Sequence, residues 1–102
     1  MPNKIILPLR SLSEKKFFSI MQNNRIVSLK HFYKKMPRKQ VYQIMRRLDA
    51  IQKCLQSAIF TKKIDYCSVT GKPVIVVYFN SEIKFHKLEN NEEIAVISPL
   101  AA

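Results

Sequence analysis

Ser28–Leu48, SLKHFYKKMPRKQVYQIMRRL, is the stretch that decides the fold. Ser28 is suited to cap a helix, and apolar residues at i, i+3, i+4 and i+7 follow it. These apolar positions are Leu29, Phe32, Tyr33 and Met36. Because the residue before a proline avoids the helical region, this helix should end at Met36. Pro37 is then well placed as the first residue of another helix.

The helix that starts at Pro37 has the clearest pattern in the chain. One side carries apolar residues and a glutamine at about 100° per residue: Val41, Ile44, Met45, Leu48, Gln52 and Leu55. The opposite side carries mainly polar and basic residues: Lys39, Tyr42, Gln43, Arg46, Ala50 and Lys53. We predict a helix over 37–50, and the pattern leaves open whether it continues to about Ser57.

The flanking segments predict a mixed α+β protein. Ser11 and Glu14 fit a capping box, which favours a helix over 12–22, and Arg25-Ile26-Val27 favours a brief strand. Residues 62–79 indicate a β-hairpin around the only glycine of the chain, Gly71. A turn over 80–82 and a further strand with Ile83 and Phe85 should follow. We therefore expect an extended arm at 1–10, a domain at 11–88, and an acidic tail or edge strand at 89–102.

The unusual feature of the composition is its large excess of basic over acidic residues. The chain has 102 residues and a formal net charge of +11 at pH 7. Residues 1–63 carry 15 basic and 2 acidic side chains, whereas residues 64–102 carry 3 basic and 5 acidic ones. Soluble surfaces normally mix both signs, so this segregation favours a polyanion-binding face over a merely solvated surface.

Several classes of function find no support in the sequence. The two cysteines, Cys54 and Cys67, have no CxxC or histidine companions for zinc, and we interpret them as small buried hydrophobes. A single glycine excludes a Gly-rich phosphate loop. No apolar run is long enough for a membrane span or a signal peptide, which favours a cytoplasmic protein with reduced thiols. We predict no catalytic set, metal or cofactor.

The order helix, short strand, helix, tight turn, helix, hairpin resembles a winged helix-turn-helix domain. The resemblance covers residues 11–79 and uses Arg25-Ile26-Val27 as the intervening strand. The two helices of the motif would be 28–36 and the helix from Pro37. The Thr70-Gly71-Lys72-Pro73 turn would be the tip of the wing. The turn between the helices departs from the usual pattern, because Met36-Pro37 stands where a glycine is common.

The resemblance implies double-stranded DNA as the partner, with helix 37–50 in the major groove. Lys39, Tyr42, Gln43 and Arg46 would face the groove, where Arg and Lys pair with guanine and Gln with adenine. Further basic residues would contact phosphates without reading sequence: Lys30, Lys34, Lys35, Arg38, Arg47 and Lys53. Lys72 would reach the backbone or minor groove from the wing tip. The expected function is a DNA-binding transcriptional regulator, and the tail 83–102 or the far end of helix 37–50 would serve a homodimer.

Two other classes remain open at this point. One is a small basic RNA-binding protein or endoribonuclease, in which Arg46, Arg47, His31 or His86 would do the acid–base work. We interpret His31 instead as a residue covering the surface of the second helix. The other class is an interaction module that presents its basic face to an acidic protein.

Overall fold

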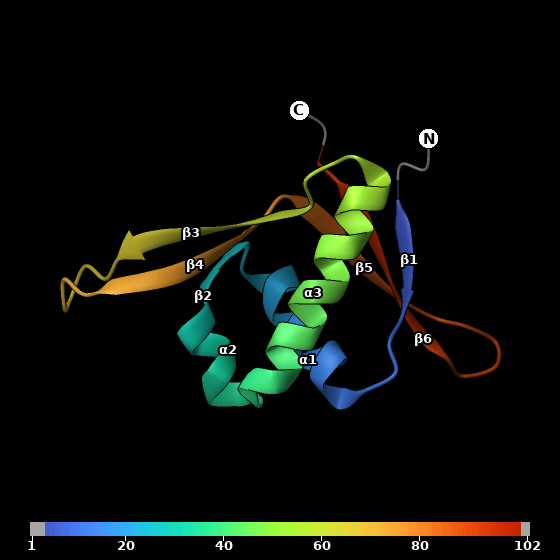
Figure 1. Ribbon diagram of the computed structural model, residues 1–102. Helices are drawn as coiled ribbons and strands as arrows, with labels where there is room; N and C mark the ends of the chain where they lie inside the picture. Colours follow the sequence, from blue (N-terminus) through green and yellow to red (C-terminus); the bar gives the residue numbers. More distant parts are fainter. Residues whose placement is uncertain (1–3, 101–102) are drawn as a thin grey trace.

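The structure is a computed structural model that describes residues 4–100, and its three helices lie close to their predicted positions (Figure 1). They are α1 (Leu12–Asn23), α2 (Leu29–Lys35) and α3 (Arg38–Leu55). Helix α3 is continuous over 18 residues, which settles the question that the sequence left open beyond Ala50. It stays intact because its buried side continues through Leu48 to Leu55. Pro37 is the cap of α3 rather than its first helical residue, and Gln56 ends the helix with a φ of 54°.

The cap of α1 confirms one half of the predicted capping box. Ser11 Oγ accepts a hydrogen bond from the Glu14 backbone N–H at 3.2 Å. The Glu14 carboxylate does not return to Ser11. It accepts instead from the Arg10 backbone N–H at 3.0 Å and from the side chain of Arg47 on α3. Glu14 therefore links the start of α1 to α3.

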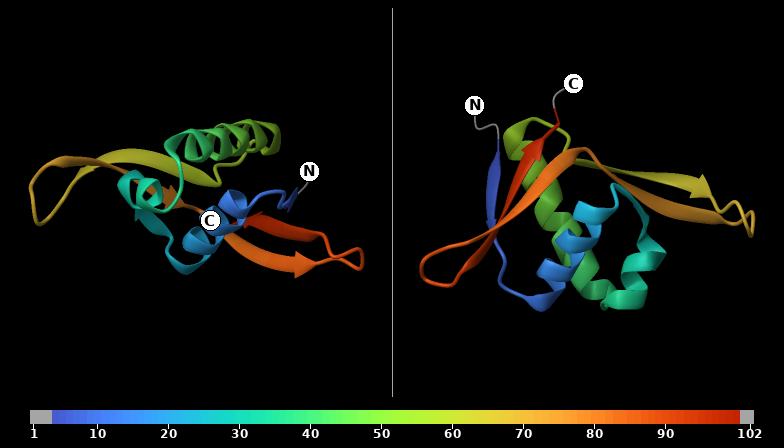
Figure 2. Two further views of the ribbon diagram at one scale, coloured as in Figure 1. Left: turned by 90° about the horizontal axis from the view of Figure 1, so that it is seen from below. Right: turned by 180° about the vertical axis from the view of Figure 1, so that it is seen from behind.

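Six strands form two antiparallel sheets. The strands are β1 (Ile5–Pro8), β2 (Ile26–Ser28), β3 (Phe60–Tyr66), β4 (Pro73–Phe79), β5 (Ser81–Lys87) and β6 (Glu93–Pro99). One sheet has the order β2-β4-β3 and the other the order β1-β6-β5. Figure 2 shows β4 running on into β5 across both sheets, so that only Asn80 separates the two strands. Ser81 and Glu82 consequently belong to β5 and not to the expected turn.

The two ends of the chain depart most from the sequence-based expectation. Residues 5–8 of the expected arm form β1, which pairs with β6. Strand β6 is the central strand of its sheet, so it is neither a tail nor an edge strand. Leu7 and Ile97 belong to the same buried core as the helices, and the expected boundaries near residues 10 and 88 do not divide that core. Residues 1–3 and 101–102 lie outside the described residues.

The core is built around aromatic side chains of α1 and α2. Phe17, Phe18 and Phe32 have no exposed surface, and the Phe17 and Phe32 rings are stacked with centroids 4.5 Å apart. Phe79 from β4 and Ala95 from β6 join them, so both sheets pack against the same helices. Full burial of these large aromatic groups contributes apolar stabilisation, of which a chain of this length has little to spare.

Candidate nucleic-acid interface

The side of α3 that faces away from the core presents the four residues expected to face a groove. Lys39, Tyr42, Gln43 and Arg46 are all exposed, while Val41, Ile44, Met45 and Leu48 are buried on the other side. Tyr42 is 52% exposed, an unusual degree for a residue with so much apolar surface. Lys53, about two turns beyond Arg46, continues the same exposed side. We call Lys39, Tyr42, Gln43 and Arg46 the α3 face.

A contact between α2 and α3 supports the aromatic part of this face. The Tyr33 and Tyr42 ring centroids lie 6.2 Å apart, and the Arg38 guanidinium carbon lies 4.8 Å from the centroid of Tyr33. Partial burial, followed by the neighbouring Tyr42 side chain, raises the pKa of Tyr33 above its ordinary value, and Arg38 offsets part of this rise. Tyr33 therefore remains a neutral phenol over the physiological range. The contact restricts Tyr42 without covering it.

The junction of the two helices concentrates exposed cations. Lys34 and Lys35 form the last turn of α2, and Arg38 and Lys39 form the first turn of α3. All four are exposed, and only Met36 and Pro37 separate the two pairs. The basic group closest to a helix C-terminus also interacts favourably with the carbonyl groups there. These four residues add exposed positive charge next to the α3 face, where an anionic partner can reach it.

Arg47 is placed differently from the other predicted DNA contacts. Its Nη1 lies 2.6 Å from Glu14 Oε1, and the two side chains are 37% and 14% exposed. Its charge is thus shared with an ion pair within the protein, and the phosphate contact expected of this residue would compete with Glu14. Gln43 lies nearby, in the wall of a 240 Å³ cavity that Glu14 and Arg47 also line. Gln43 therefore marks the boundary of the α3 face toward α1.

The β3–β4 hairpin reaches well beyond the helices, over the side on which α2 lies (Figure 1). Its turn contains Gly71 with a φ of 69°, a conformation that favours glycine, and the neighbouring Lys72 is exposed. Lys62 and Lys63 add exposed cations on β3. The outer half of β3 carries apolar side chains that are exposed, since Ile64 is 72% and Tyr66 70% exposed. The alternation of polar and apolar residues in β3 is that of an ordinary half-buried strand. It does not indicate that the helices stop before they reach Ile64 and Tyr66.

The cysteines are not buried hydrophobes, which corrects the expectation from the sequence. Cys54 is exposed on α3, and Cys67 is partly exposed at the hairpin turn. Hydrogen bonds from the Thr70 side chain, and then from the backbone of Thr70 and Val69, lower the pKa of Cys67 to about 7. The lowered pKa increases the fraction of Cys67 that is thiolate at neutral pH.

Other chemistry is sparse in the part of the chain that the structure describes. His31 lies on α2 and His86 on β5, and over residues 4–100 no three His, Cys, Asp or Glu side chains gather where a metal ion would need them. Within the same residues, each helix is too short or too polar to cross a lipid bilayer.

Comparison with known proteins identified no relative of this chain. No protein-family model, curated protein or solved structure matches the chain.

Proposed function

We propose that the protein is a DNA-binding regulator of the winged-helix type, in which α3 enters the major groove of duplex DNA. The exposure of the whole α3 face, opposite a buried apolar stripe, is the observation that carries this proposal. Arg, Lys and Gln are the side chains that pair with base edges in the major groove, and a helix is the element that this groove admits. The four cations at the α2–α3 junction supply phosphate contacts beside it.

The sheet β2-β4-β3 gives independent support for the winged-helix part. A short strand between α1 and α2 pairs with the hairpin that follows α3: Val27 lies opposite Val77. This is the element order that the winged architecture requires. In the proposed complex the hairpin is the wing, and Lys72 at its turn contacts the DNA backbone or the minor groove.

Fluorescence anisotropy with a random 20-base-pair duplex, at low salt and at physiological salt, tests the proposal. We expect binding at low salt, and a loss of about tenfold in affinity for each of Lys39→Ala and Arg46→Ala. Lys84→Ala serves as the matched control, because Lys84 is an exposed lysine on β5 in the other sheet. Equal losses in all three variants would assign the binding to net charge alone.

Selection of bound sequences from a random duplex pool then separates a specific regulator from a non-specific binder. An enriched site supports the regulator, and a palindromic site also supports a dimer. Failure to bind duplex DNA at low salt would overturn the proposal. In that case, cleavage of labelled RNA that His31→Ala or His86→Ala abolishes would indicate the endoribonuclease, and capture of an acidic protein would indicate an interaction module.

A further inference from the structure

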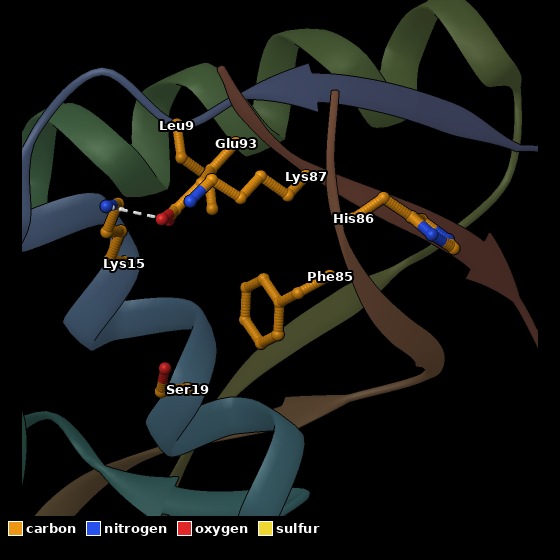
Figure 3. A pocket seen from close by; sticks show the side chains of 7 residues that line it. All are labelled: Leu9, Lys15, Ser19, Phe85, His86, Lys87 and Glu93. Carbon is orange, nitrogen blue, oxygen red and sulfur yellow. Dashed lines mark ion pairs between the residues drawn. The ribbon is translucent and has the colours of Figure 1, made fainter. Parts of the chain in front are cut away.

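The turn end of the β5–β6 hairpin and α1 line an open cavity of about 340 Å³ that the proposed DNA contacts do not use. Figure 3 shows the Phe85 ring projecting from β5 toward α1, with Ser19 across from it. Leu9 closes the cavity on a third side. Phe85 and Leu9 are only partly buried, so both offer apolar surface to an occupant. The volume is at the lower end of the range of roughly 300–1,000 Å³ for small-molecule sites.

Three charged groups stand at the upper wall of this cavity. Lys15 Nζ on α1 lies 2.7 Å from Glu93 Oε2 on β6, and both side chains are about 40% exposed. Lys87 is directly opposite Glu93 in the pairing of β5 with β6, and its side chain runs toward the ion pair (Figure 3). His86 also borders the cavity, but its side chain points away from it (Figure 3). Two ammonium groups and one carboxylate therefore stand at this wall, which leaves a single surplus positive charge among the three.

We infer that this cavity binds a small aromatic monocarboxylate, with the ring on Phe85 and Leu9 and the carboxylate between Lys15 and Lys87. The apolar floor selects a ring of modest size, and offset or edge contacts with Phe85 suit such a ring. One surplus positive charge matches a monoanion, whereas a dianionic phosphate would bring one negative charge more than these three groups neutralise. The half-exposed Lys15–Glu93 pair is inexpensive to rearrange, because such pairs contribute little to stability.

The site is separate from the α3 face, so this inference does not rest on the proposed function. Benzoate is the probe, and ¹⁵N–¹H NMR titration at constant ionic strength is the measurement. We expect saturable shifts confined to residues around Ser19 and Phe85, with a Kd of about 1 mM for so small a ligand. Benzyl alcohol has a similar size and no charge, and it should bind at least about fivefold more weakly.

Two substitutions test the charged part and the apolar part of the cavity separately. Lys87→Met removes one ammonium group from an exposed position and should weaken benzoate about fivefold. Phe85→Leu should weaken it by a similar factor while benzyl alcohol weakens too. Lys84→Met is the matched control, because Lys84 lies on the same strand but on its opposite side, and it should leave the Kd unchanged.

The inference fails if benzoate produces no saturable shifts, or if benzyl alcohol binds as tightly as benzoate. It also fails if Lys84→Met weakens benzoate as much as Lys87→Met does, since that would indicate attraction to the overall positive charge. Duplex DNA binding is unaffected by any of these outcomes, so the two proposals stand or fall separately.

Discussion

Arg47 and Glu14 connect α3 to the first turn of α1 through an ion pair of 2.6 Å between Nη1 and Oε1. Glu14 is only 14% exposed and also accepts the Arg10 backbone N–H. This arrangement sets the position of the α3 face relative to α1. It also explains why Arg47 is less exposed than the basic residues near it on α3, since its guanidinium group pairs with Glu14.

Arg47→Ala should lower the free energy of unfolding by about 1–2 kcal/mol, because it leaves a mostly buried carboxylate with one partner fewer. The value lies below that of a fully buried pair since the arginine itself is 37% exposed. Urea denaturation measures it. Lys84→Ala breaks the exposed 3.9 Å contact with Glu82 and should cost under about 0.5 kcal/mol. Equal effects of the two substitutions would contradict the assignment.

Leu7→Ala should destabilise the protein by about 2–4 kcal/mol, because Leu7 is 4% exposed in the core beneath β1. Ile6→Ala is the control in the same strand. Ile6 is 57% exposed and should cost less than about 1 kcal/mol. Thermal or urea unfolding of both variants distinguishes a packed strand from an extended arm, for which neither substitution would matter.

Ser81→Ala should stabilise the protein by up to about 1 kcal/mol. Ser81 is 3% exposed, and its Oγ has no hydrogen-bond partner among the described residues. Removing a buried hydroxyl without a partner relieves its desolvation cost. A rise in the unfolding midpoint is the expected result. A loss of more than about 1 kcal/mol would mean that the hydroxyl is satisfied in solution.

Cys67 should react with iodoacetamide along a pH profile with its midpoint near 7, measured in a Cys54→Ser background. The pKa is lowered, so reactivity is present above pH 7 and falls away as the pH drops below it. Thr70→Val removes the largest cause of the shift and should move the midpoint upward, toward the ordinary value for a thiol. An unchanged midpoint in that variant would show that another group stabilises the thiolate.

The salt dependence of duplex binding should reveal how many cations engage phosphates. With about six contacts, the slope of log K against log salt concentration is near −5. Replacing both Lys39 and Arg46 by alanine should reduce its magnitude by up to about 2 if both contact the backbone. Base-edge contacts would instead change the sequence preference at a nearly constant slope. A flat salt profile in the unmodified protein would contradict a polyanion interface.

Local patterns predicted the helices and the hairpin because each depends on residues close together in the chain. The cap at Ser11, the apolar stripe of α3 and the turn at Gly71 need no distant partner to be recognisable. The exposure of Lys39, Tyr42 and Arg46 followed from the same stripe, since a helix that buries one side exposes the other.

Several environments that the sequence did not indicate depend on distant parts of the chain. Arg47 looks like its exposed neighbours until Glu14 of α1 is placed beside it. The exposure of Ile64 and Cys67 depends on where the helices end beneath the hairpin, which no pattern within β3 can indicate.

The sequence by itself determined three amphipathic helices, a basic exposed side on the third, and a hairpin, because side-chain periodicity and turn chemistry act over a few residues. Only the tertiary structure decided that the two ends of the chain meet as β1 and β6, because strand pairing across such a separation depends on the assembled core. The same assembly brought α1 and the β5–β6 hairpin together around the cavity at Phe85.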